Sequence, residues 1–124
     1  THTQHFNDSA QIVTDLVKSI NKRMNGISIH SDEFEFKTID AGLYRLLYGR
    51  DDDDIWGICL RSYKPDLAVT WTRSFEHTTR FVRIAAVCQV PDVIENVANK
   101  LEAASKAIEV AEPVIEALVL ALKV

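Results

Sequence analysis

Apolar residues at helical spacing mark the first element of the chain. They recur three or four positions apart at Val13, Leu16, Val17, Ile20 and Met24, as on one face of an α-helix. Asn7, Asp8 and Ser9 before them are residues that cap helix N-termini, and Asn25-Gly26 after them tolerates the left-handed cap conformation. The pattern predicts a helix over residues 9–24, preceded by a flexible segment over residues 1–8.

The period of the pattern changes to two in the middle of the chain. Strand-like segments, half-buried or apolar on both faces, occur at residues 27–30, 33–37, 43–48, 55–63 and 67–72. In the last of these, we expect Leu67, Val69 and Trp71 to face the core. Turn sequences such as Lys64-Pro65-Asp66 separate the segments, and no helix comes between them. These features predict an antiparallel meander of about four to five strands.

The segment 74–89 supports two interpretations. Ser74 can cap a helix in which Glu76 and Arg80 pair four residues apart. The β-branched residues among positions 81–87 favour a strand instead. We predict a helix that begins at Ser74 and keep the strand as the alternative.

The end of the chain carries a strict heptad pattern. Its apolar residues follow alternating steps of three and four: Ile94, Val97, Leu101, Ala104, Ile108, Ala111, Ile115, Leu118 and Leu122. Pro91 suits a first helical turn, so residues 92–124 are predicted to be helical. Pro113 lies inside the pattern and removes a helical hydrogen bond, which allows one kinked helix or two helices. After Pro113 the apolar surface widens, which indicates burial on more than one side.

These elements together predict a single α+β domain over residues 1–124. The fold class is an N-terminal helix, the antiparallel meander, and the C-terminal helical segment packed on one face. Because a heptad seam pairs helices, the segment 92–124 is also a candidate oligomerisation element. Its predicted interface consists of Val97, Leu101, Ile108, Ile115, Leu118 and Leu122.

Composition agrees with a soluble globular chain. The 124 residues are 47% hydrophobic and 26% charged, enough for one core without disulfide or metal support. The longest uncharged apolar run, residues 117–122, is far short of the roughly 20 residues of a membrane span. Cys59 and Cys88 each lie in an apolar run, so we expect buried, reduced thiols and a cytoplasmic location.

Charge is distributed unevenly along the chain. The net charge is −4, but residues 55–83 contain five bases and two acids, whereas both flanking segments are acidic. This middle segment is where an anionic ligand would be attracted. The acidic balance of the whole chain argues against nucleic-acid binding. Trp56 and Trp71 are in phase with aliphatic neighbours, which indicates core packing rather than base stacking.

The strongest polar constellation in the sequence is basic. Arg73, His77 and Arg80 are spaced four and three residues apart, with Ser74 between them and Arg83 beyond. If a helix begins at Ser74, these side chains gather near its N-terminal turns, where free N–H groups favour a phosphate or carboxylate. His77 could also act as an acid or base near neutral pH. A surface cap with ordinary ion pairs is the alternative.

Motifs for catalysis and cofactor binding are missing from the sequence. The glycines do not form a phosphate or dinucleotide loop, and HExxH, GxSxG and CxxC are absent. The four aspartates 51–54 could attract a divalent cation, but they lack EF-hand spacing and instead suit a solvated hairpin tip. We therefore expect no catalytic residue, no cofactor and no metal.

The hypothesis that follows is a non-catalytic binding, adaptor or inhibitor-type protein that acts through protein–protein contacts. Its partner would be a second copy of the chain, forming a homo-oligomer, or another protein. The alternative is a small anionic-ligand binding protein, for a nucleotide or phosphate, or a minor enzyme that uses Arg73, His77 and Arg80.

Overall fold

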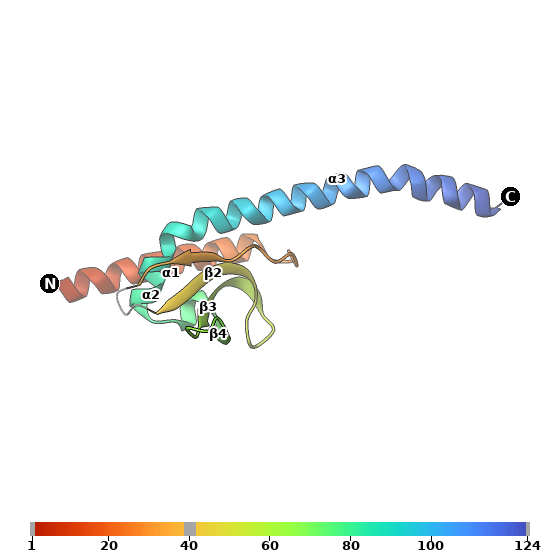
Figure 1. The fold of residues 1–124 in the computed structure, drawn as a ribbon. Coiled ribbons are helices and arrows are strands. Elements are labelled where there is room, and N and C mark those ends of the chain that lie inside the picture. Colours follow the sequence, from red (N-terminus) through yellow and green to blue (C-terminus); the bar gives the residue numbers. More distant parts are fainter. Residues whose placement is uncertain (1, 39–41, 124) are drawn as a thin grey trace.

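The computed structural model describes the backbone of residues 2–38 and 42–123 and the side chains of residues 8–38 and 42–123. Its main elements are α1 (His2–Arg23), β1 (Phe34–Phe36), β2 (Leu43–Arg50), β3 (Trp56–Tyr63), β4 (Val69–Ser74), α2 (Arg80–Ala86) and α3 (Val90–Lys123). Two 3₁₀ turns, η1 (Phe75–His77) and η2 (Val87–Gln89), flank α2. The strands form one antiparallel sheet in the order β1-β2-β3-β4. The predicted α+β meander is thereby confirmed (Figure 1).

The core lies where alternate residues of the two central strands meet the helices. β2 and β3 pair from Leu43↔Tyr63 to Arg50↔Trp56. This register sets buried side chains of the two strands beside apolar residues of the helices and of η1: Leu46, Tyr48, Ile58, Leu60, Val17, Phe75, Val82, Val93 and Val97. Trp56 and Trp71 pack against this cluster, as their phase in the sequence indicates.

Helix α1 begins earlier than the sequence pattern predicts. It starts at His2, so Asn7, Asp8 and Ser9 lie within the helix and do not cap it. Inside a helix these residue types cost at most about 0.7 kcal/mol each relative to alanine, so a cap preference is easily overridden. The flexibility of residues 1–8 stays a prediction.

The segment 27–30 is not a strand, although its apolar and polar residues alternate. Residues 27–33 have no regular secondary structure, but specific hydrogen bonds hold them against the sheet. The Ser31 N–H donates to the Tyr48 carbonyl at 2.9 Å, and the Tyr48 N–H donates to Ser31 Oγ at 2.7 Å. A side-chain oxygen thus takes over one strand-pairing bond, and regular pairing begins only at Phe34.

Of the three residues of segment 67–72 that were predicted to face the core, only Trp71 packs against it. Leu67 lies in the turn after β3 with a positive φ of 68° and is 62% exposed, and Val69 is also exposed. Thr72 lies opposite Arg61 on the sheet face away from the core, and it is buried there, where its Oγ1 accepts a hydrogen bond from Arg61 Nε at 2.9 Å. The register shifts between Ser62 and Tyr63, and an irregularity of this kind breaks the period-two alternation on which the prediction depended.

The segment after β4 is helical, as predicted, but the helix begins later. Ser74 is the last residue of β4, η1 follows, and α2 starts at Arg80 with Thr79 as its N-cap. Phe75 in η1 is 1% exposed. Because this ring is buried beside the sheet, the chain forms a tight turn at the position where the sequence predicts the start of a helix.

Helix α3 is one continuous helix that contains Pro113. Only its first turns pack on the sheet side, through the buried residues Val90, Val93 and Val97. Polar contacts hold the same turns in place, because Lys100 Nζ lies 2.9 Å from Asp32 Oδ1 and Asn96 Nδ2 donates to Asp32 Oδ2. Figure 1 shows α3 continuing well beyond the rest of the molecule and bending in its distal part.

Candidate functional site

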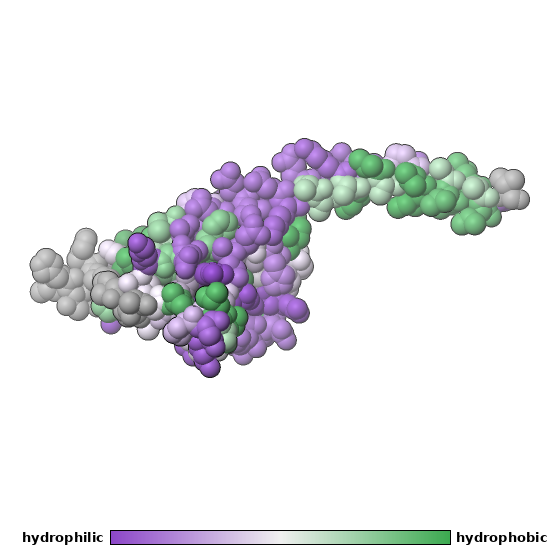
Figure 2. Space-filling model, viewed as in Figure 1, coloured by the Kyte–Doolittle hydropathy of each residue, from purple (hydrophilic) through white to green (hydrophobic). Residues whose placement is uncertain are grey.

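Residues 101–123 form a helical segment, termed the α3 extension, outside the body, which comprises all elements up to residue 100. Every residue of the extension is exposed except Ala111, which is half-buried. At about 1.5 Å per residue its 23 residues span roughly 35 Å. Figure 2 shows hydrophobic side chains over much of its distal part, whereas the visible face of the body is mainly hydrophilic.

Most of the predicted interface residues lie on the α3 extension. Leu101 is 37% exposed, Ile108, Ile115 and Leu118 are more exposed, and Leu122 reaches 86%. Val97 differs, because it is 1% exposed and belongs to the core of the body. The exposed part of the heptad seam therefore begins at Leu101.

The polar side of the extension is acidic and regular. Glu102, Glu109 and Glu116 repeat every seven residues, so they occupy one heptad position beside the seam. Lys106 Nζ lies 3.1 Å from Glu102 Oε1, an ion pair within one turn. With four acids and two bases between residues 101 and 123, the extension has a net charge of −2.

The basic residues predicted to converge lie on three successive elements. Arg73 on β4 stacks on Trp71, with its guanidinium carbon 4.4 Å from the ring centroid. His77 in η1 is exposed and has its Nε2 4.0 Å from Glu76 Oε1. Arg80 is the first residue of α2. Since no helix begins at Ser74, the helical spacing on which the anion site depended is not formed.

Two further members of that predicted cluster connect parts of the fold. Ser74 Oγ donates a hydrogen bond to Asp51 Oδ2 at 3.2 Å. Arg83 Nη1 donates to Thr14 Oγ1 at 2.9 Å and links α2 to α1. Arg83 Nε is buried without a hydrogen-bond partner among the described residues. These contacts give Ser74 and Arg83 structural roles.

The four aspartates 51–54 are only partly the solvated tip that the sequence suggests. Asp51 is buried, and its Oδ1 accepts hydrogen bonds from the N–H groups of Asp53 and Ile55. Asp52 Oδ2 accepts from the Thr72 N–H at 3.1 Å. These carboxylates thus organise the β2–β3 turn. Across the described residues, no group of three or more acidic, histidine or cysteine side chains is placed to bind a metal ion.

A polar cluster that sequence reasoning missed lies around Glu33. Glu33 Oε1 accepts hydrogen bonds from Arg61 Nη1 at 2.9 Å and from the Tyr63 hydroxyl, and Oε2 lies 3.7 Å from Arg45 Nη1. Burial, followed by the bond to Glu33, raises the pKa of Tyr63. Because β2 and β3 set Arg45 opposite Arg61, a correct register would have revealed the pair of arginines and their need for a carboxylate. The charged side chains of this cluster pair with one another, and the cluster presents no nucleophile.

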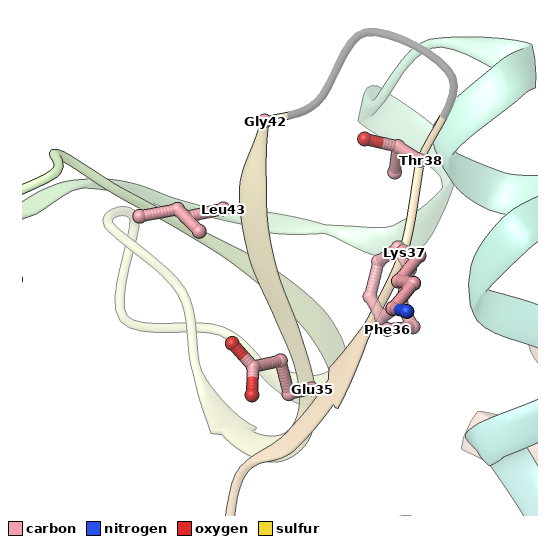
Figure 3. Close-up of a pocket in the computed structure, with 6 residues that line it drawn as sticks. All are labelled: Glu35, Phe36, Lys37, Thr38, Gly42 and Leu43. Carbon is pink, nitrogen blue, oxygen red and sulfur yellow. The ribbon is translucent and has the colours of Figure 1, made fainter.

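Two hollows of about 540 Å³ each mark the surface of the body. Figure 3 shows the first, which lies where β1 ends and β2 begins and is lined by Glu35, Phe36, Lys37, Thr38, Gly42 and Leu43. The second is an apolar groove between α1 and the start of α3, lined by Leu16, Ile20, Val87, Val90, Pro91, Ile94 and Glu95. This groove lies next to the root of the α3 extension.

The two cysteines are free thiols in different surroundings. Cys59 is buried on β3, as expected, but Cys88 on η2 is exposed. The apolar run around Cys88 is real, yet it lies in a 3₁₀ turn of which one side faces solvent. The expectation of two buried thiols is therefore wrong for Cys88, and the absence of a disulfide between these two cysteines is confirmed.

Among the described residues, none of the helices has the length and apolarity needed to cross a membrane. Comparison with protein-family models, curated proteins and solved structures finds no match.

Proposed function

We propose that this chain is a non-catalytic interaction protein that associates with a second copy of itself through the α3 extension. The observation that carries the proposal is the change along one heptad seam. Val97 of the seam is buried in the core of the body and Ile94 packs partly against it, whereas from Leu101 onward the large apolar side chains of the seam are exposed. Most helical stability in proteins comes from packing of an apolar face, so a second surface that covers the seam would stabilise the extension.

The apolar side chains of the seam are numerous enough to support association. Full burial of one Leu or Ile side chain is worth about 1.5–3 kcal/mol relative to exposure. Each copy offers five such residues from Leu101 to Leu122. Association costs about 4–15 kcal/mol in lost translational and rotational freedom. The free energy gained by burying these side chains exceeds the lower values of that range.

The charge of the extension favours a protein partner over a membrane surface. Helices that lie on membranes carry Lys and Arg on their polar face, which attract anionic lipids. The polar positions of the extension are mainly glutamates, and its net charge is −2. A second copy buries the seam and leaves this acidic stripe in water.

Measurement of mass in solution tests the proposal. We expect light scattering across a concentration series to give a multiple of the 14.0 kDa chain mass. Ile108→Asp places a carboxylate on the seam, where burial without a partner is costly, and should yield monomers. Val110→Asp is the matched control, because Val110 is exposed and lies off the seam. A wild-type chain that stays monomeric at all concentrations would contradict the proposal.

The anionic-ligand alternative gains no support, because the helix on which the convergence of Arg73, His77 and Arg80 depended begins only at Arg80. The proposed association needs no cofactor. The free thiols Cys59 and Cys88 support a reducing compartment, and we place the protein in the cytoplasm as part of the same proposal.

A further inference from the structure

We infer that the two α3 extensions of the proposed homo-oligomer pack antiparallel, with the larger seam positions of one helix against the smaller positions of the other. The inference rests on the proposed function and names the geometry of its partner. The larger positions are Leu101, Ile108, Ile115 and Leu122, and the intervening seam positions are Ala104, Ala111 and Leu118.

The first argument for the antiparallel orientation is the alternation of large and small side chains along the seam. In a parallel pair each seam residue meets its own copy, so a layer of two Ile108 side chains would be followed by a layer of two Ala111 side chains. The alanine layers leave voids between the two helices, and voids in a helical core are costly. In an antiparallel pair the two seam positions face each other, so Ile108 meets Ala111 of the second copy. The layers that contain Ala104 or Ala111 then each combine one large and one small side chain, and Leu118 meets Leu101 of the second copy.

The second argument for the antiparallel orientation comes from the apolar side chains at the distal end of the extension. Val114, Val119 and Leu120 lie off the seam, yet each is at least 44% exposed, so the distal turns are apolar on more than one side. In a parallel pair these turns lie together at the far end, roughly 35 Å from both bodies. In an antiparallel pair they lie beside the body of the second copy, where additional apolar surface is available.

The body offers such apolar surface near the root of its own extension. The groove between α1 and α3 includes Leu16, which is 50% exposed, and Ile94. Ile94 precedes Leu101 by seven residues, about 10.5 Å along the helix axis. With Ile108 against Ala111, Val119 and Leu120 of the second copy lie beside residues 100 and 99, between one and two helical turns from Ile94. The apolar groove is therefore close to the last turns of an antiparallel partner.

Distances between spin labels at equivalent sites of the two copies test the orientation. Glu102→Cys, Glu109→Cys and Glu116→Cys place one label each at the same heptad position beside the seam. The background carries Cys88→Ser, because Cys88 is exposed and Cys59 is buried. Neighbouring sites are about 10.5 Å apart along the helix. The same labels in Ile108→Asp chains are the control and should show no distance between copies.

An antiparallel pair predicts unequal distances. Because the two helices run in opposite directions, moving a label by seven residues changes the axial separation of the two labels by about 20 Å. In any antiparallel register, at least two of the three sites therefore differ by about this amount in axial separation. The measured distances should therefore differ by roughly 10 Å or more. Equal distances at all three sites mean a parallel pair, which overturns the orientation and leaves self-association intact. A monomeric mass with no distance between copies overturns both proposals.

Discussion

Cys59 has 1% of its surface exposed, and burial, the largest cause, raises the pKa of its thiol to about 12. Its Sγ also lies 3.3 Å from the Gly57 carbonyl and 3.5 Å from the Gly49 carbonyl. Cys88 is exposed on η2. Because the thiolate is the reactive form of cysteine, the two residues differ both in access and in the fraction of reactive species.

We predict that a thiol reagent labels one cysteine per native chain at pH 8 and two after denaturation. The native signal should disappear in Cys88→Ser, whereas Cys59→Ser should retain it. Absorbance of the released chromophore or intact mass gives the count. Rapid labelling of both thiols without denaturant would show that the sheet around Cys59 opens readily.

At the scale of single elements, Pro113 is the weak point of α3. Proline has no N–H to donate to the carbonyl four residues earlier, that of Glu109, and its ring presses against that carbonyl. Inside a helix such a residue costs about 3 kcal/mol. Here it lies in the middle of the extension, where the body provides no compensating contacts.

We predict that Pro113→Ala strengthens the extension and leaves the body unchanged. Amide hydrogen exchange of residues 107–115 should slow by roughly ten- to a hundred-fold, following the cost of an interior proline. Val114→Ala serves as the neighbouring control, since it restores no hydrogen bond. Unaltered exchange in Pro113→Ala would mean that another contact already holds this part of the helix.

At the scale of the whole molecule, the body and the extension have separate energetic roles. The apolar core takes its last residue from α3 at Val97, and the last polar link to the body is that of Lys100 with Asp32 and the His30 carbonyl. Residues 101–123 add no buried side chain. The body should therefore fold on its own contacts.

We predict that a chain of residues 1–100 folds cooperatively as a monomer. Its denaturation midpoint should not depend on protein concentration, whereas that of the full chain should rise with concentration, because association stabilises the folded state by mass action. Circular dichroism during urea titration at several concentrations checks both. An unfolded 1–100 chain would show that the extension contributes to folding of the body itself.

The fold was predictable where local periodicity and burial agree. The apolar stripe of α1, the inner strands β2 and β3, and the heptad of α3 each follow from residue spacing. Errors occurred where a local pattern met a tertiary constraint. Residues 27–30 alternate like a strand, but the neighbouring Ser31 bonds to Tyr48 through its side chain. The register shift between β3 and β4 sets Val69 opposite Tyr63, away from the core, and Val69 is exposed. Periodicity contains no information about either feature.

For the candidate site, residue spacing alone identifies the residues of α3 that share a seam, because helical geometry depends only on that spacing. The point at which the seam changes from core to surface depends on how the chain folds around α3. Val97 and Leu101 occupy the same heptad stripe, but the body ends between them, so one is buried and the other is exposed. The reach of the sheet and of α1 along α3 sets that boundary, and it arises from contacts between residues far apart in the chain.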